Sequence, residues 1–168
     1  RRVKIDLTPL RLGVVTLASE SDKGHLIRRL FEHCKYHSLA ERSDMLATLE
    51  DIFGPNDQPV PCMSAAELRQ LVEAGFEIGA HTVNHPILRF CSAREAEHEI
   101  AACREVLASI SGSPITAFAY PNGKVGLDIQ PEHLAMVRKC GYTCALTTQT
   151  GVARSGDDLL QIPRFTPW

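Results

Sequence analysis

The segment Glu77-Ile78-Gly79-Ala80-His81-Thr82-Val83-Asn84-His85-Pro86 joins a strand pattern to a pair of histidines. Apolar residues alternate with polar or small ones over residues 76–80, and this period of two predicts a β-strand. His81 then falls at the carboxyl end of that strand. Pro86 disfavours an ordinary helix through His85, because proline restricts the residue before it. The segment therefore predicts two imidazoles in the turn that follows a strand.

These two histidines are candidate metal ligands. His81 and His85 are four residues apart, a spacing that brings two side chains to one side of a single helix-like turn. Two neutral imidazoles would supply two ligands of a zinc-type site, and a catalytic site needs a third protein ligand and an open position for water. Many such pairs are solvated loop residues. The strand end and the small residues Gly79 and Ala80, which let other backbone approach, favour metal binding here.

The residues after 63 alternate between helix and strand patterns. Capping boxes at Ser64–Glu67 and Ser92–Glu95 predict two helix starts, and Gly75 and Gly141 predict two helix ends. Further strands are expected at residues 115–119, 142–148 and 159–165, with a helix opened by Pro131. This alternation predicts an α/β fold with a parallel sheet or barrel. In such folds chemistry gathers at the carboxyl ends of strands, where the sequence places His81, Tyr120 and Thr147.

The first 60 residues have a different pattern. Strands are possible at residues 3–7 and 13–17, residues 19–24 look like a polar loop, and helical spacing follows at residues 25–39 and 41–53. Histidines 25, 33 and 37 lie on these expected helices. We assign them no role, because surface histidines on amphipathic helices outnumber ligands.

Composition excludes some classes of function. The chain has 168 residues, 44% of them hydrophobic, which suits one globular domain with a real core. A net charge of −2 gives no electrostatic reason to expect nucleic acid or an anionic membrane as partner. No apolar run reaches membrane-spanning length. The six cysteines contain no Cys-x-x-Cys pair, which favours free thiols in a reducing compartment and hence a cytoplasmic location.

Three stretches together resemble the NodB-homology polysaccharide deacetylases, which form carbohydrate esterase family 4. The first is residues 77–86, similar to the family's His-Ser/Thr-x-x-His metal motif. The second, Phe-Ala-Tyr-Pro-Asn-Gly at 118–123, is similar to its substrate-groove motif, and the third is Ile-Pro-Arg-Phe at 162–165. The resemblance covers residues 61–168, whereas residues 1–60 match weakly. It implies a partial or distorted (β/α) barrel, present as a single and N-terminally incomplete domain.

Two family features are missing from this sequence. The family's Asp-Asp-Gly strand supplies a catalytic base and a third metal ligand, but the only adjacent aspartates here are Asp157 and Asp158. The family's late Leu-x-His, which supplies a general acid, is also missing, since no histidine follows His133. We expect that the first strand lies upstream or has been lost, and that activity of this chain is impaired.

The resemblance implies roles for the residues that remain. His81 and His85 would bind a divalent metal, first of all zinc, with cobalt, nickel or manganese as alternatives. The backbone N–H of Tyr120 would stabilise the oxyanion, and its ring with Pro121 would wall a sugar-binding groove. Arg164 would hold the missing base aspartate ionised. The alternative interpretations, without a catalytic role, are that Tyr120 only caps a strand and that Arg164 is a surface arginine.

The implied reaction is removal of N-acetyl groups from an N-acetylated polysaccharide or glycan. Two other functions stay open at this point. The chain could be a non-catalytic carbohydrate-binding remnant that keeps the groove without the chemistry, or a related barrel amidohydrolase acting on a small C–N substrate.

Overall fold

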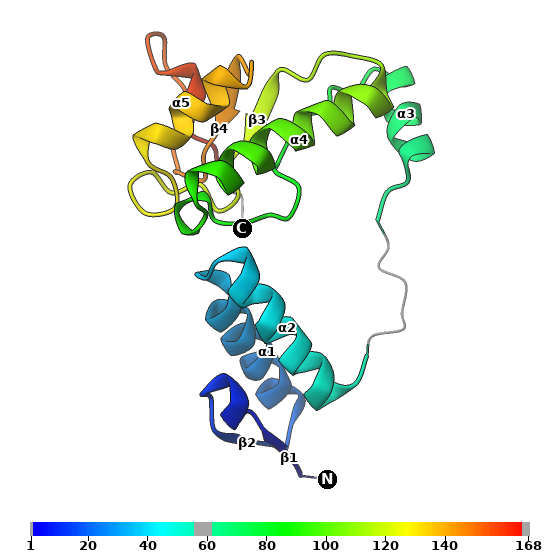
Figure 1. Ribbon diagram of the computed structural model, residues 1–168, viewed down its shortest axis with the longest axis vertical. Coiled ribbons are helices and arrows are strands. Elements are labelled where there is room, and N and C mark those ends of the chain that lie inside the picture. The colour runs from blue at the N-terminus through cyan, green and yellow to red at the C-terminus, as the bar shows by residue number, and fades with distance from the viewer. Residues whose placement is uncertain (1, 56–61, 166–168) are drawn as a thin grey trace. The chain divides into compact units, whose positions relative to one another are not determined.

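The structure is a computed structural model that describes residues 2–55 and 62–165 (Figure 1). The chain divides into two compact units, Arg1–Val60 and Pro61–Trp168, and each is described by itself. Whether the two form a single incomplete domain, as expected from the sequence, stays a prediction. None of the helices in the described ranges is long and apolar enough to span a bilayer.

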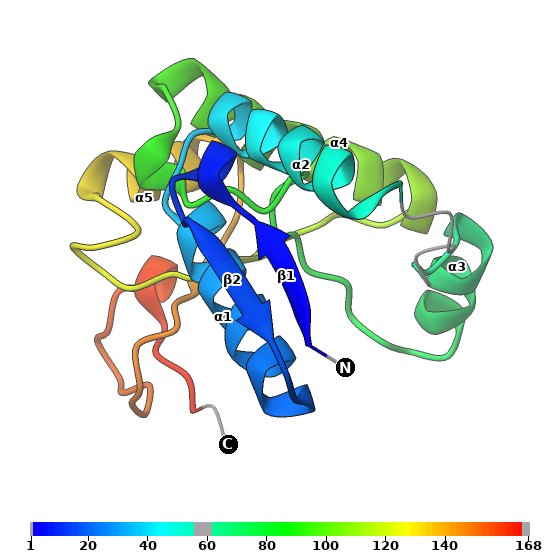
Figure 2. The ribbon, with the colours of Figure 1, turned by 90° about the horizontal axis from the view of Figure 1, so that it is seen from below.

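The first unit combines a hairpin with two helices. Strands β1 (Val3–Asp6) and β2 (Val14–Leu17) pair antiparallel and flank the short 3-10 helix η1 (Thr8–Leu10). They are followed by α1 (Glu20–Lys35) and α2 (Leu39–Phe53), and α1 lies along the hairpin (Figure 2). Four buried leucines form the core of this unit: Leu7, Leu10, Leu17 and Leu26.

Helix α1 begins earlier than the sequence predicted. The Ser19 hydroxyl accepts the Asp22 N–H, and the Asp22 carboxylate accepts the Ser19 N–H at 2.8 Å. This reciprocal pair is a capping box, so the expectation of a loop over residues 19–24 is wrong. The polar residues of this stretch satisfy free N–H groups in the first helical turn.

The second unit begins with α3 (Ala65–Glu73), η2 (Leu88–Phe90) and the long helix α4 (Ala93–Ser111). It continues with β3 (Ala117–Ala119), α5 (Pro131–Lys139), β4 (Cys144–Leu146) and η3 (Leu159–Gln161). Capping boxes at the starts of α3 and α4, built on Ser64 and Ser92, confirm the two predicted helix starts.

The sheet of this unit is parallel. Strands β3 and β4 pair in parallel, with Phe118 opposite Ala145. Single parallel bridges extend the pairing on both sides, from Ala80 to Phe118 and from Leu146 to Ile162. The α/β fold with a parallel sheet is therefore confirmed.

Two of the expected strands are reduced to single bridges. Residues 76–80 contribute only the bridge at Ala80, and residues 159–165 form η3 followed by the bridge at Ile162. The short helix η3 in place of a strand has a local cause, because the Asp158 carboxylate accepts the Leu160 N–H at 3.0 Å and caps this helix.

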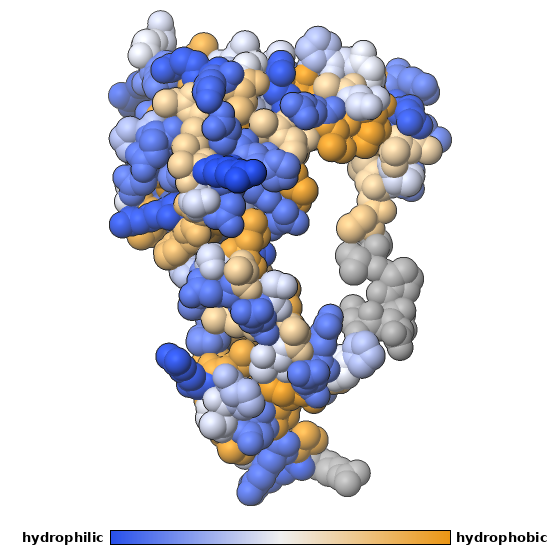
Figure 3. Space-filling view, viewed as in Figure 1, coloured by the Kyte–Doolittle hydropathy of each residue, from blue (hydrophilic) through white to orange (hydrophobic). Residues whose placement is uncertain are grey.

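Helices α4 and α5 cover the sheet with apolar side chains. Phe118 packs edge to face on Tyr120, with ring centroids 5.2 Å apart, and also contacts the Tyr142 ring. Hydrophilic side chains cover most of the face of this unit seen in Figure 3, with an apolar patch near the contact of α3 with α4. The remaining buried core residues include Ile100, Ile115, Ile129 and Val137.

Helix α5 contains a pH-sensitive cap. His133 is 5% exposed, its Nδ1 accepts the Gln130 N–H at 2.9 Å, and burial lowers the pKa of its imidazole. The folded state then binds fewer protons than the unfolded chain. The contribution of His133 to the free energy of unfolding is therefore fully present above about pH 6.5 and falls as the pH drops below that value. Urea denaturation at pH 7.5 and 5.5 should show this loss, and His133→Gln should reduce it. His98→Gln, at an exposed position on α4, is the control; an equal pH effect in both variants would contradict the prediction.

Candidate functional site

The structure places His81 and His85 side by side at the end of the sheet. Their ring centroids are 4.7 Å apart and the rings meet at 77°, so both imidazoles lie on the same side of the backbone. His81 directly follows Ala80, whose N–H and C=O both pair with β3. Both histidines are exposed to solvent. The two imidazoles therefore lie next to each other, and their binding of a shared ion stays a prediction.

A hydrogen bond from the neighbouring strand orients the first imidazole. His81 Nδ1 lies 2.7 Å from the carbonyl oxygen of Ala119, the last residue of β3. Since a carbonyl only accepts, Nδ1 carries the proton and Nε2 keeps its lone pair. Metal-binding histidines in proteins are commonly held by such a bond from the second ring nitrogen.

The backbone of this loop is unusual in two places. Thr82 has a φ of 64° and His85 a φ of 52°, both in the left-handed region that side chains rarely adopt. Each such residue costs on the order of 1–3 kcal/mol and is retained where surrounding contacts impose it. Strain of this kind often occurs at functional sites.

Helix α4 supplies the contacts that hold this backbone. The Glu99 carboxylate accepts the N–H groups of Val83 and Asn84, each at 2.8 Å, and the Asn84 side-chain amide at 2.6 Å. One turn further along the helix, burial raises the pKa of the Cys103 thiol, and the nearby backbone of His81 opposes that rise. Glu99 is 2% exposed.

Our reading of the sequence missed Glu99, although a signal was present. It lies three residues after Ala96 and four before Cys103, on the apolar stripe that packs against the sheet. A carboxylate at a core position of a helix requires hydrogen-bond donors nearby. The donors come from the histidine loop, residues 81–85, which the sequence pattern had already indicated.

The residues present fit part of a metal site. Two imidazoles can occupy two positions of a divalent ion, which matches zinc chemistry. Within residues 2–55 and 62–165, however, no group of three or more His, Cys, Asp or Glu side chains is placed to hold an ion. Asp6, Asp22 and Asp157 each accept hydrogen bonds from nearby backbone N–H groups instead.

Tyr120 lies differently from the groove wall that the resemblance implied. Its side chain has no exposed surface, and its hydroxyl donates to the carbonyl oxygen of Leu160 at 3.1 Å. Its backbone N–H donates to the Leu146 carbonyl at 3.0 Å, so sheet pairing already uses the expected oxyanion donor. Pro121 is buried as well. Neither residue presents a surface to a substrate in this structure, and their place in a substrate groove stays a prediction.

The other candidate residues lie in the neighbouring loops. Arg164 is partly exposed, and its backbone N–H donates to the Gln149 carbonyl at 3.0 Å. Its pairing with a base aspartate stays a prediction. Thr147 is fully buried, and its hydroxyl donates to the Ile162 carbonyl at 3.3 Å. It therefore serves the sheet and does not point to solvent.

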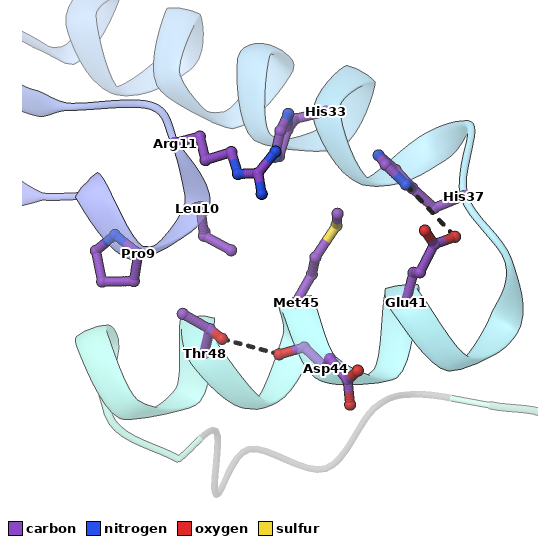
Figure 4. Close-up of a pocket in the computed structure, with 9 residues that line it drawn as sticks. All are labelled: Pro9, Leu10, Arg11, His33, His37, Glu41, Asp44, Met45 and Thr48. Carbon is purple, nitrogen blue, oxygen red and sulfur yellow. Dashed lines mark hydrogen bonds and ion pairs between the residues drawn. The ribbon is translucent and has the colours of Figure 1, made fainter.

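A separate hollow of about 370 Å³ lies in the first unit, between η1, the end of α1 and α2 (Figure 4). His37 Nδ1 lies 3.7 Å from the Glu41 carboxylate, and the His33 and His37 rings meet edge to face. These side chains are exposed or only partly buried. His33 lies near the end of α1, but α1 ends at Lys35, so His37 lies in the turn before α2 and not on the helix expected for it; we assign this pair no ligand.

Comparison with solved structures supports the fold. A deacetylase from Streptococcus pyogenes, PplD, solved with acetate, is 24% identical and superposes with a TM-score of 0.56 over 61% of this chain and 43% of its own. The polysaccharide deacetylase BC0361 from Bacillus cereus is 27% identical, with a TM-score of 0.55 over 72% of this chain and 40% of its own. The chain thus spans less than half the length of either structure. No curated protein matches it.

The family itself is shown by the sequence. A model of the polysaccharide deacetylase family matches residues 40–145, which is more than half of the chain and includes the histidine loop, Glu99 and β3. The match begins within α2, earlier than the limit of residue 61 that the motifs suggested. The chain belongs to the polysaccharide deacetylase family.

Proposed function

We propose that this chain contributes to a metal-dependent hydrolase that removes N-acetyl groups from an amino-sugar polymer or glycan. The observation that carries the proposal is the paired imidazoles, 4.7 Å apart, with His81 Nδ1 bonded to the Ala119 carbonyl. The family supports the reaction class. The acetate in the Streptococcus pyogenes deacetylase is the product that such a reaction would release.

His81 and His85 would hold the ion, and zinc fits their chemistry best. A bound zinc ion lowers the pKa of water to about 7 and polarises a carbonyl oxygen. The protein's own part is to keep both imidazoles aligned. The Ala119 carbonyl does this for His81 by fixing its tautomer. The buried carboxylate of Glu99 fixes the backbone between the two histidines.

Among the described residues, no third His, Cys, Asp or Glu side chain joins the two histidines in a ligand group, and the sequence has no Asp-Asp-Gly strand to supply the family's base. We therefore expect this chain to need an Asp-Asp-Gly strand for efficient catalysis. An N-acetylated polysaccharide is the proposed partner, and nothing in the charge of the chain favours nucleic acid.

The test is a histidine substitution in a protein extended at its N-terminus by an Asp-Asp-Gly strand. His81→Ala should lower zinc- or cobalt-dependent acetate release from N-acetylglucosamine oligomers at least about 100-fold, because the remaining ligands no longer hold the ion that activates water. His98→Ala changes an exposed histidine on α4 and should leave the rate unchanged.

Equal activity of the His81→Ala protein and its parent would refute the proposal. A substrate panel separates the alternatives. Release of acetate from chitin oligomers or peptidoglycan fragments supports the deacetylase, whereas hydrolysis confined to small amides supports an amidohydrolase. Binding of oligomers without turnover would identify a carbohydrate-binding remnant.

A further inference from the structure

The Glu99 side chain is a buried carboxylate that accepts hydrogen bonds from one short loop. Three N–H donors, two from the backbone at Val83 and Asn84 and one from the Asn84 amide, lie 2.6–2.8 Å from its two oxygens. With 2% exposure, the carboxylate has almost no access to water. Hydrogen bonds to a charged acceptor are about twice as strong as neutral ones.

No arginine or lysine of the described part of the chain forms a salt bridge with Glu99. Burial of a carboxylate is unfavourable unless hydrogen bonds compensate for the lost water, and here the loop provides them. An apolar side chain at this position would pack against the core without that requirement. The carboxylate therefore serves the conformation of the loop and is not needed to pack the helix.

The loop that Glu99 holds is the turn between the two imidazoles. Its backbone passes through left-handed residues at Thr82 and His85, on either side of the two N–H groups bound by the carboxylate. Without the carboxylate, those N–H groups would have to turn toward water, and the turn would relax toward ordinary dihedral angles. The relative placement of His81 and His85 would then be lost.

We propose that Glu99 is a positioning residue of the metal site, acting through the backbone of Val83 and Asn84 to keep the imidazoles of His81 and His85 side by side. The proposal rests on the proposed function, because it assigns the histidines to a metal. Glu99 itself touches neither metal nor substrate. Its effect is on the affinity for the ion.

The experiment is a zinc chloride titration of the whole chain, followed by the ring ¹⁵N signals of each histidine. Glu99→Met removes every acceptor while keeping a similar volume, and we expect it to weaken zinc binding at His81 and His85 about 10- to 100-fold, as for other outer-shell partners. Glu99→Gln keeps one oxygen for the two backbone N–H groups and should restore part of the affinity.

The matched control is Ile100→Val, the next residue on the same helix. Ile100 is fully buried and its substitution removes one methylene, so the unit loses stability without touching the loop. The control should bind zinc within about twofold of wild type. A purely structural role for Glu99 predicts that Glu99→Met also keeps its affinity once folded, and that result would overturn the proposal.

A second variant and a metal-free readout cover the remaining outcomes. If Glu99→Met does not fold, Asn84→Asp serves in its place, because it puts a second carboxylate against Glu99 from an exposed position. This variant should also weaken zinc binding. An unchanged affinity overturns the proposal. If wild-type His81 and His85 do not respond to zinc, the two histidines of this chain do not hold the ion by themselves, and the protein extended by an Asp-Asp-Gly strand tests the proposed function separately. The role of Glu99 in placing the two rings is then decided by NMR contacts between the rings and by hydrogen exchange at Val83 and Asn84. Loss of the contacts between the rings and of the protection of the two N–H groups from exchange, in Asn84→Asp or Glu99→Met, supports the proposal. Retention of both overturns it.

Discussion

A protein extended at its N-terminus by an Asp-Asp-Gly strand should release acetate from N-acetylglucosamine oligomers at least about 10²–10⁴-fold faster than the 168-residue chain. General-base assistance alone accounts for that factor. The third metal ligand adds to it, because two imidazoles supply only two of the three protein ligands in a usual catalytic zinc site. The measurement is a side-by-side assay of the two proteins with zinc or cobalt.

Comparable rates from the two proteins would place the base and the third ligand within these residues. The aspartates to test would be Asp6, Asp22 and Asp157. The structure gives each of them a local task, because their carboxylates accept the N–H groups of Thr8, of Ala18 and Ser19, and of Arg154. Any catalytic use would therefore require these turns and caps to rearrange, so we expect the rates to differ.

Gly123→Ala should destabilise the second unit by about 3 kcal/mol, which corresponds to a fall in melting temperature of about 13 °C. Gly123 has a φ of 71°, and a Cβ there would lie 3.0 Å from the Tyr120 carbonyl oxygen and 3.1 Å from the Thr148 nitrogen. Both neighbours belong to backbone, which cannot move without disturbing the pairing at the end of the sheet. Thermal unfolding followed by circular dichroism measures the loss.

Gly126→Ala is the matched control for this substitution. Gly126 has a φ of 80°, but a Cβ there would meet nothing within 4 Å. Its cost should be only that of a left-handed alanine, about 1 kcal/mol. Equal losses in the two variants would show that backbone crowding at Gly123 contributes nothing.

Much of the architecture followed from local chemistry. Ser64 and Ser92 mark helix starts because each forms a reciprocal bond with a glutamate three residues later, and that pattern is visible in the sequence. The parallel sheet followed from the alternation of helices and strands. The histidine pair followed from spacing at a strand end, which depends only on backbone geometry.

The properties that could not be predicted depend on contacts between distant segments. Glu99 looked like any helix glutamate until the loop at Val83 and Asn84 was seen to place its N–H groups against it. The partner of the Tyr120 hydroxyl could not be predicted either, because it is the carbonyl of Leu160, forty residues away along the chain. The start of α1 was missed for a different reason, since a capping aspartate resembles a loop residue.

The parallel pairing also has a consequence for the order in which the second unit can form. Each pairing, from Ala80 to Phe118 and from β3 to β4, joins segments separated by a helix and its connecting loops. Such non-local contacts form slowly, because loop closure must precede them. During synthesis from the N-terminus, β3 leaves the ribosome with a single bridge partner, and Phe118 stays uncovered until β4 has emerged. We therefore expect the helices to form first, and the histidine site to be complete only when β3 docks and its Ala119 carbonyl reaches His81.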